Sequence, residues 1–316
     1  MARIRVAVTG DEWCNRDEVL AGIAANTGDQ ELILEVNTEG PSLHALGIVQ
    51  TVSAALAEAG ISDQNVYVDQ WHNPVEQIPW KRWRDVGLSH FFWMSDRYRH
   101  QEPDAPQDFR VFGLFVGRLT AARAVMLYDV CHDMRDKVLV SLMRNSYRVN
   151  TYETEIQDWL DLSQQQRLTT WLGQQPVVSL TNHEVRDQYR PEHNTNADLV
   201  RHYNRFAIEI VAETYCQGDA FFPTEKVIRP LAKKKPFVLY GPRNFLRHLR
   251  DLGFQTWHDV WDEGYDSLAG PDRWAAMKST LHYIMDNNLW SRPAVSSICQ
   301  ANLDRLESLI KKHEPL

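Results

Sequence analysis

The chain contains little that would place it in a membrane or in an oxidising compartment. Its 316 residues include no apolar run near the ~20 residues that span a bilayer, and the short basic start MARIRVAV leads into a predicted strand. The four cysteines lie far apart without a C-x-x-C pair, which argues against a disulfide framework and against a zinc ribbon. We therefore expect a cytoplasmic protein whose thiols are reduced, some of them buried.

Motifs of several common nucleotide and metal enzymes are also missing. No G-x-G-x-x-G follows a predicted strand, no Walker lysine loop is present, and neither H-E-x-x-H nor G-x-S-x-G occurs. A D-x-D pair, which would hold a divalent metal on a diphosphate, is absent as well. We expect no cofactor and no metal site, so any phosphate must be bound by arginine, lysine and helix ends.

The net charge of −8 disfavours a protein that coats nucleic acid through its overall field. Non-specific affinity for a polyanion comes from clustered lysine and arginine, and a local basic cleft could still form on an acidic protein. The residues that could form such a cleft are a lysine run and three arginines: Lys233 to Lys235, Arg243, Arg247 and Arg250. Such charges more often form a solvated helix face.

Apolar β-branched runs alternate with helical segments along the chain. The predicted strands are residues 4–8, 32–36, 66–68, 90–93, 111–116, 137–142, 207–211, 236–240 and 254–257. The predicted helices are 16–25, a segment from Pro41 to 59, 119–134, 152–173, one from Glu225, 242–252, 271–287 and 292–313.

This alternation predicts an α/β protein with two Rossmann-like, doubly wound domains that face a cleft, with ligands at the carboxyl ends of the strands. We expect an N-terminal acceptor domain at 1–106 and a C-terminal donor domain at 107–290. The helix within 291–316 is a candidate to pack back on the N-terminal domain.

The stretch 215–240 (YCQGDAFFPTEKVIRPLAKKKPFVLY) has an unusual arrangement of charge. A polar loop ends at Thr224 and opens a helix with Glu225 and Lys226 between two predicted strands. The start of a helix has unpaired N–H groups and partial positive charge, so a lysine there is unfavourable unless a phosphate or carboxylate neutralises it. The alternative is a solvated Lys226 paired with Glu225.

Two further cations occupy comparable positions. Arg118 follows the predicted strand 111–116, and Arg123 lies in the first turns of the next helix. Strand ends and helix starts of one parallel sheet converge, so these arginines and Lys226 could share a diphosphate while Glu225 accepts from ribose hydroxyls. Alternatively, Arg123 pairs within its own helix and Arg118 caps a turn.

The block FFPTEK at 221–226, followed by Pro230 and KPF at 235–237, resembles the donor-binding motif of fucosyltransferase-like glycosyltransferases. In that family a T-E-K triplet opens a helix against the nucleotide sugar. Gly117 and Arg118, with Arg123, are similar to the arginine-bearing first strand and helix of the same donor domain.

Two other segments, 253–266 (GFQTWHDVWDEGYD) and 37–43 (NTEGPSL), resemble parts of phage-encoded glycosyltransferases of this group. The resemblance implies the two-Rossmann GT-B fold, a nucleotide-diphosphate sugar as donor, transfer without a catalytic metal and, for a phage protein, the host cytoplasm. It leaves the sugar and the nucleotide open.

An inverting glycosyltransferase needs a base for the acceptor hydroxyl and cations for the leaving diphosphate. Asp11 and Glu39 follow the first two predicted strands and are the candidate bases, with His44 and His72 as weaker choices. Both carboxylates also precede helices, where they are favoured for purely structural reasons.

The acceptor has two candidate classes. One is a glycan or small molecule; the other is a hydroxymethylated base in phage-type DNA, which would have to be flipped or distorted to expose its hydroxyl. A third reading makes the protein a non-enzymatic nucleotide-binding protein, in which the T-E-K block only caps a helix. No membrane partner is expected.

Overall fold

The computed structural model of the chain describes residues 2–9, 12–26, 31–36, 43–44, 46–70, 77–82, 98, 100–105, 108–117, 119–142, 156–174, 180, 199–216 and 221–313. The chain divides into two compact units. Unit 1 comprises Met1–Phe91 and Tyr215–Phe222, and unit 2 comprises Phe92–Thr214 and Pro223–Leu316. Each unit holds one four-stranded, all-parallel sheet, so the predicted α/β class with two Rossmann-like sheets is confirmed.

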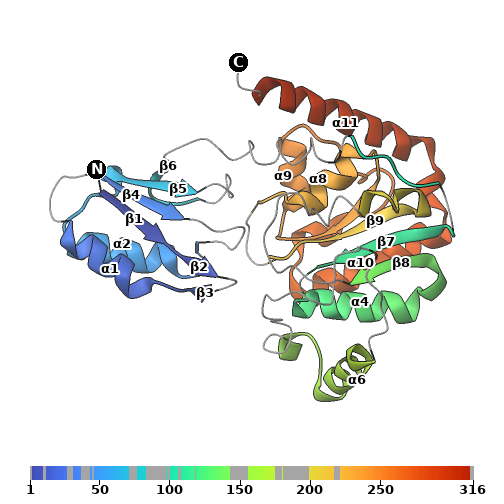
Figure 1. Cartoon of the computed structure of the whole chain (residues 1–316), viewed down its shortest axis with the longest axis horizontal. Helices are drawn as coiled ribbons and strands as arrows, with labels where there is room; N and C mark the ends of the chain where they lie inside the picture. The colour runs from blue at the N-terminus through green and yellow to red at the C-terminus, as the bar shows by residue number, and fades with distance from the viewer. Residues whose placement is uncertain are drawn as a thin grey trace. The chain divides into compact units, whose positions relative to one another are not determined.

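The sheet of unit 1 has the spatial order β1-β4-β5-β6, which is also the order along the chain. Crossovers between parallel strands are right-handed, so successive steps in one direction place their helices on one face. Helices α1 and α2 accordingly lie together on the same face (Figure 1). The elements are β1 (Ala2–Val6), a β2–β3 hairpin (Val8–Thr9 and Glu12–Trp13), α1 (Arg16–Ala25), β4 (Leu32–Val36), α2 (Ile48–Glu58), β5 (Val66–Gln70) and β6 (Lys81–Arg82).

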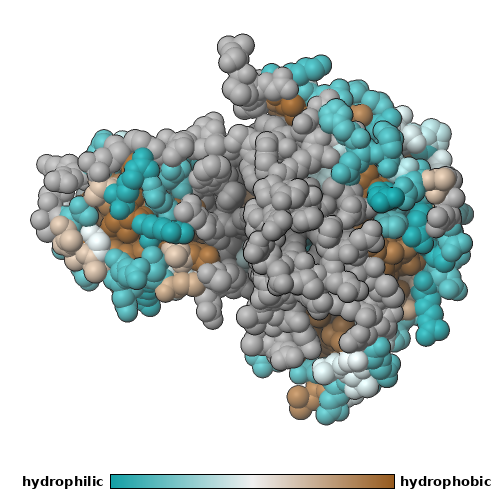
Figure 2. Space-filling model, in the orientation of Figure 1, coloured by the Kyte–Doolittle hydropathy of each residue, from teal (hydrophilic) through white to brown (hydrophobic). Residues whose placement is uncertain are grey.

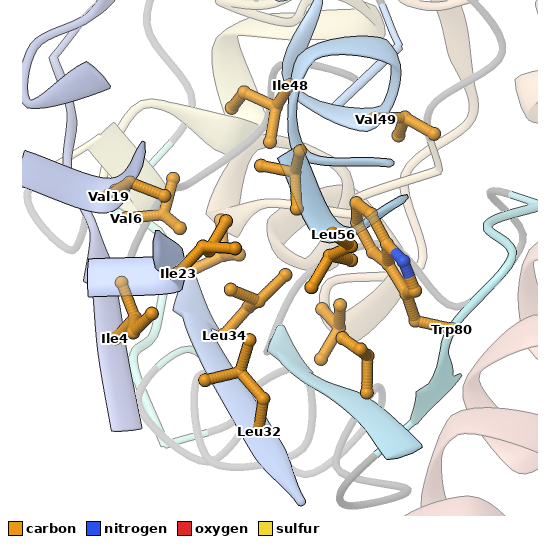
Figure 3. Close-up of a cluster of buried hydrophobic side chains, with 14 of the residues drawn as sticks. Ile4, Val6, Val19, Ile23, Leu32, Leu34, Ile48, Val49, Leu56 and Trp80 are labelled. Atoms are coloured by element: carbon orange, nitrogen blue, oxygen red, sulfur yellow. The ribbon is translucent and has the colours of Figure 1, made fainter. Parts of the chain in front are cut away.

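Side chains that alternate along these strands form the core of unit 1. Ile4 and Leu34 point toward the two helices and share an apolar cluster with Trp80 (Figure 3). Val52 and Val68 belong to the same cluster. The other face is mixed. Arg3 and Glu35 form an exposed ion pair between neighbouring strands, whereas Ile33 and Asp69 on the same face are buried.

Helix α2 begins later than the sequence suggested. It was expected from Pro41, but the described helix starts at Ile48. Gly47 precedes it with φ 68°, and the Ile48 N–H donates to the Leu43 carbonyl at 2.9 Å. A left-handed residue cannot continue an α-helix, so this glycine fixes the start.

The sheet of unit 2 has the order β10-β9-β7-β8. The chain steps from β7 through α4 to β8 in one direction, and from β9 through α8 to β10 in the other. Right-handed crossovers then place α4 and α8 on opposite faces, and Figure 1 shows this doubly wound arrangement. The elements are β7 (Arg110–Val116), α4 (Ala121–Asp133), β8 (Val138–Leu142), α6 (Leu162–Gly173), β9 (Phe206–Ala212), α8 (Glu225–Ala232), β10 (Phe237–Tyr240), α9 (Phe245–Asp251), α10 (Gly270–Asp286) and α11 (Pro293–His313).

A charged network lies inside unit 2. Glu209 of β9 and Arg229 of α8 form an ion pair with 1% and 2% of their side chains exposed. The Arg229 Nε–H donates to the Tyr203 hydroxyl at 2.9 Å, and that hydroxyl donates to Glu209. The half-buried Lys235 donates from Nζ to the carbonyls of Tyr203 and Phe206, each at 2.8 Å. Lys235, one of the candidates for a basic cleft, thus donates to the backbone of its own unit.

Residues 254–257 were predicted to be a strand, and they are an irregular segment instead. The Gln255 N–H donates to the Asn302 side chain at 2.7 Å, and the Asn302 amide donates back to the Gln255 carbonyl at 2.9 Å. One side chain of α11 thus takes the place of a strand ladder. It also ties α11 to the rest of unit 2.

Other elements begin at different residues than predicted. The helix expected over 152–173 begins at Leu162, where Asp161 and Gln164 form a reciprocal capping box. The predicted strand 90–93 lies outside the described residues.

All four cysteines are free, and Cys299 is buried, as expected.

The described surface is mainly hydrophilic on the face drawn in Figure 2, with apolar residues in separate small patches. Phe109 and Leu162 are the most exposed large apolar side chains, at 56% and 77%. In the part of the chain that the structure describes, no helix combines the length and apolar character needed to cross a membrane.

Candidate functional site

The doubly wound sheet of unit 2 has a topological switch point between β7 and β9. These strands pair in parallel, yet the connection that follows each of them departs in the opposite direction. Ligands of open α/β sheets bind outside the carboxyl ends of the strands at such a point, because the two connecting loops separate there. The loops after β7 and β9 lead into α4 and α8, which carry the predicted phosphate-binding residues.

Glu213, the first residue after β9, is the centre of this edge. Its N–H donates to the Tyr240 carbonyl at 2.8 Å, which continues the pairing with β10. Its carboxylate, with the side chain 2% exposed, accepts from the Thr224 hydroxyl at 2.9 and 2.8 Å to its two oxygens. Strand β9 and the start of α8 are thereby held together through one buried carboxylate.

The helix start itself is capped as the sequence predicted. Thr224 is the N-cap, and its hydroxyl oxygen accepts from the Lys226 N–H at 3.2 Å. The Lys226 ammonium donates to Glu225 at 2.8 Å and lies 3.7 Å from Glu213. Only 15% of the Lys226 side chain is exposed.

These contacts correct one step of the sequence reasoning. Lys226 was expected either to need an external anion or to be solvated and paired with Glu225. The pair with Glu225 is present, but the lysine is largely buried and also lies close to Glu213, so two carboxylates of its own chain neutralise it. A bound phosphate would have to compete with Glu213 and Glu225 for this ammonium.

Arg123 joins α4 to the same edge. It is 1% exposed, and its Nε and Nη2 donate to the Ala212 carbonyl at 3.2 and 2.5 Å. Both bonds go to the last residue of β9, outside the helix that carries Arg123. The carbonyl at the end of β9 is thus bound by a guanidinium from the helix that follows β7.

Burial and charge act in opposite directions on the two glutamates. Burial raises the pKa of Glu213, and the charges of Lys226 and Arg123 partly oppose that rise. Burial also disfavours ionisation of Glu225, but the charge and hydrogen bond of Lys226 dominate and lower its pKa to about 2. With both carboxylates ionised, these two cations and two anions sum to a formal charge of zero.

Several predicted site residues cannot be placed. Arg118, Asp11, Glu39 and His72 all lie outside the described residues. His44 is described and exposed; its Nε2 donates to the Gln77 carbonyl at 2.7 Å. That bond fixes the tautomer of a neutral ring and leaves Nδ1, 3.5 Å from the Gln50 amide, as the acceptor.

Arginines in α9 and just before it are partly engaged within unit 2. Arg250 pairs with Glu263 at 3.2 Å, and Arg243 donates to the Ser267 carbonyl at 3.2 Å. Lys233 donates to the Gln101 carbonyl. These internal bonds occupy donors that a polyanion would otherwise use in a basic cleft.

Glu213 was missed at the sequence level, although a signal was present. It is the first carboxylate after an apolar strand, in the run FAIEIVAET, and such a position lies at the ligand-binding edge of a parallel sheet. The described residues contain no group of three or more histidine, cysteine, aspartate or glutamate side chains that could hold a metal ion.

The chain was compared with protein-family models, with curated proteins and with solved structures. None of the three comparisons gives a match.

Proposed function

We propose that this protein is a metal-independent glycosyltransferase, which moves a sugar from a nucleotide-diphosphate sugar to an acceptor hydroxyl. One observation carries the proposal: Arg123 and the Thr224-Glu225-Lys226 helix start meet at the switch point of unit 2. This is the edge of the sheet where nucleotides bind in doubly wound folds. The fucosyltransferase-like character of the same triplet supports a nucleotide sugar as the ligand.

In this proposal Lys226 stabilises the leaving diphosphate together with the N-terminal N–H groups of α8. Its ammonium exchanges a carboxylate for a phosphate oxygen when the donor binds. Glu213 keeps Thr224 and Lys226 in place, and Glu225 becomes available to ribose hydroxyls. Arg123 of α4 holds the end of β9 in place through the Ala212 carbonyl. Arg118 is a further candidate cation for the diphosphate.

Transfer with inversion requires a base that takes the proton of the acceptor hydroxyl as its oxygen attacks the anomeric carbon. We propose Asp11 or Glu39 for this role. Asp11→Asn and Glu39→Gln should each leave donor binding within twofold of the unaltered protein. The one that is the base should lower turnover at least a hundredfold.

Donor binding is tested by thermal-shift and calorimetric titration with a panel of nucleoside-diphosphate sugars. A bound donor should stabilise the fold by ~2.7 kcal/mol at a hundredfold excess over Kd. Lys226→Ala should weaken that affinity at least tenfold. Lys278→Ala is the matched control, because Lys278 also bonds two carboxylates, Asp129 and Asp133, near the opposite end of α4.

The proposal fails if no sugar nucleotide shifts the melting temperature of the unaltered protein. It also fails if both lysine variants bind the donor equally well.

Neutralisation of Lys226 by Glu213 and Glu225 favours a second candidate, a nucleotide-binding protein without transfer activity. The two are separated by product analysis. Release of free nucleoside diphosphate with sugar added to an acceptor supports the transferase. Tight nucleotide binding with no turnover in any acceptor mixture supports the binding protein.

For the acceptor, we propose the hydroxymethylated base of phage-type DNA, with a glycan or small molecule as the alternative. Binding to duplex DNA should weaken steeply as salt rises, since each phosphate contact releases counterions. A flat salt dependence would exclude the DNA acceptor and leave the glycan or small molecule.

A further inference from the structure

A groove between α4 and α6 is built differently from the switch-point edge. It has a volume of about 400 Å³ and is walled by three aromatic residues, Tyr128 and His132 from α4 and Trp171 from α6. A neighbouring hollow of about 200 Å³ shares Tyr128 and Arg167 with it and extends the groove toward Val125. Even without the neighbouring hollow, the volume of the groove falls within the ~300–1,000 Å³ typical of small-molecule sites.

The three rings hold one another in place. Tyr128 and His132 stack with their centroids 4.0 Å apart, and Trp171 meets the Tyr128 ring nearly at right angles at 5.4 Å. The His132 Nδ1 donates to the Tyr128 carbonyl at 2.8 Å, which fixes the imidazole on its own helix. Rings that are fixed before a ligand arrives lose little conformational entropy on binding.

Hydrogen-bonding side chains surround these rings. Gln166, Thr170 and Gln174 line the groove from α6 and are exposed. Arg167 also lines it, and its Nη1 donates to the Ser163 hydroxyl at 3.0 Å, one turn earlier in the same helix. Amides and hydroxyls both donate and accept, which suits a ligand rich in hydroxyl groups.

The charges of the groove disfavour ionic ligands. Among the described residues that line it, Arg167 is the one arginine or lysine, and it would repel a cation held against the aromatic rings. Asp129 lies on the wall of the smaller hollow, where it accepts from Trp274 at 2.8 Å and Lys278 at 3.0 Å. A single arginine beside this carboxylate offers little to a polyanion such as nucleic acid.

We infer that the groove between α4 and α6 is a binding site for a neutral saccharide of one or two rings. The apolar C–H face of a sugar ring packs on Trp171 and Tyr128, while its hydroxyls bond to Gln166, Thr170 and Arg167. The site is separate from the proposed donor site. His132 lies nine residues beyond Arg123 on α4, a rise of ~14 Å along the helix axis.

The test uses the full chain and a panel of neutral mono- and disaccharides of glucose, galactose, mannose and N-acetylglucosamine. Binding is followed by saturation-transfer NMR and calorimetry. We expect saturable binding of at least one sugar. Trp171→Ala should weaken it at least tenfold, Trp171→Phe should retain most of it, and Thr170→Ala should weaken it about threefold.

Thr169→Ala is the matched control, because Thr169 is an exposed neighbour on α6 that does not line the groove. It should change the affinity by less than twofold. A switch-point variant, Lys226→Ala, should leave saccharide binding intact, which keeps this result distinct from failure of the donor site.

The inference is overturned if no sugar of the panel binds saturably, or if Trp171→Phe loses as much affinity as a Trp171→Ala protein that is shown to be folded. Saturable binding of choline or of a short single-stranded oligonucleotide at Trp171, without sugar binding, would replace it with a cation or nucleic-acid site.

Discussion

The two parallel sheets of this chain are wound in different ways, and the difference determines where a ligand site can form. In unit 1 the described strands follow chain order, and α1 and α2 share one face. In unit 2 the chain reverses direction between β8 and β9, and helices lie on both faces. Only a reversal separates two neighbouring loops at the carboxyl edge of a sheet.

Each sheet also contributes a glutamate to an arginine–glutamate ion pair, and the two pairs differ in solvent exposure. Arg3 and Glu35 of unit 1 join neighbouring strands with 48% and 31% of their side chains exposed. Arg229 and Glu209 of unit 2 are 2% and 1% exposed and bond a tyrosine hydroxyl as well. Loss of one partner should therefore lower the free energy of unfolding much more for the buried pair than for the exposed pair.

The largest effect is expected from Arg229→Met. Removing the cation leaves the buried Glu209 carboxylate without its paired guanidinium, which should lower the free energy of unfolding by ~3–5 kcal/mol. Urea denaturation measures this loss. The double variant Glu209→Gln with Arg229→Met should recover much of it, and a loss below ~1 kcal/mol in the single variant would contradict the comparison.

A slightly smaller loss should follow from Leu34→Ala in the core of unit 1. Leu34 is fully buried on the helix-covered face of β4, so its truncation leaves a cavity and should cost ~2–4 kcal/mol. Leu162→Ala is the control, since this leucine is 77% exposed and should give ~0.5 kcal/mol or less. Equal losses in the two variants would argue against the described core.

Lys235 should make the stability of the protein depend on alkaline pH. Burial lowers its pKa from 10.5 to about 8 in the folded protein. Between those values the unfolded chain binds the proton more tightly, so this lysine makes the protein more stable as pH rises from about 8 to 10.5.

Denaturation of Lys235→Met across that pH range, compared with the unaltered protein, isolates this contribution. The difference should be on the order of 1–2 kcal/mol, after allowing for solvent screening of a half-buried group. Parallel stability curves for the two proteins would show that the ammonium does not lose its proton on folding in this range.

The smallest effect is expected from Arg3→Ala. An exposed pair contributes ~0–1 kcal/mol, and most of that should disappear in high salt. Denaturation at low and high ionic strength measures both values. A loss as large as that of Arg229→Met would remove the contrast between the exposed and the buried pair.

Local sequence signals gave several elements correctly because they do not depend on distant residues. Helix α1 begins at Arg16 and α8 at Glu225, where the sequence predicted, and Thr224 caps α8. The strand predicted at 254–257 failed for the opposite reason. Its backbone bonds go to Asn302, and no signal near Gln255 indicates that partner.

The candidate site was only partly predictable. Thr224, Glu225, Lys226 and Arg123 were found from their positions at helix starts, and the structure places them at one sheet edge. Glu213 was not found, because its importance depends on how the loop after β9 returns to it.

The sequence by itself determined the α/β class and the position of a charged helix start after the third strand of unit 2, since both follow from hydrophobic periodicity and capping. The tertiary structure decided the charge balance of that start. Strand β9 places Glu213 within 3.7 Å of Lys226 across thirteen positions of sequence, so a phosphate would have to compete with this carboxylate for the ammonium. Periodicity describes which face of an element is buried, whereas the partner of a buried charge depends on how the chain folds back.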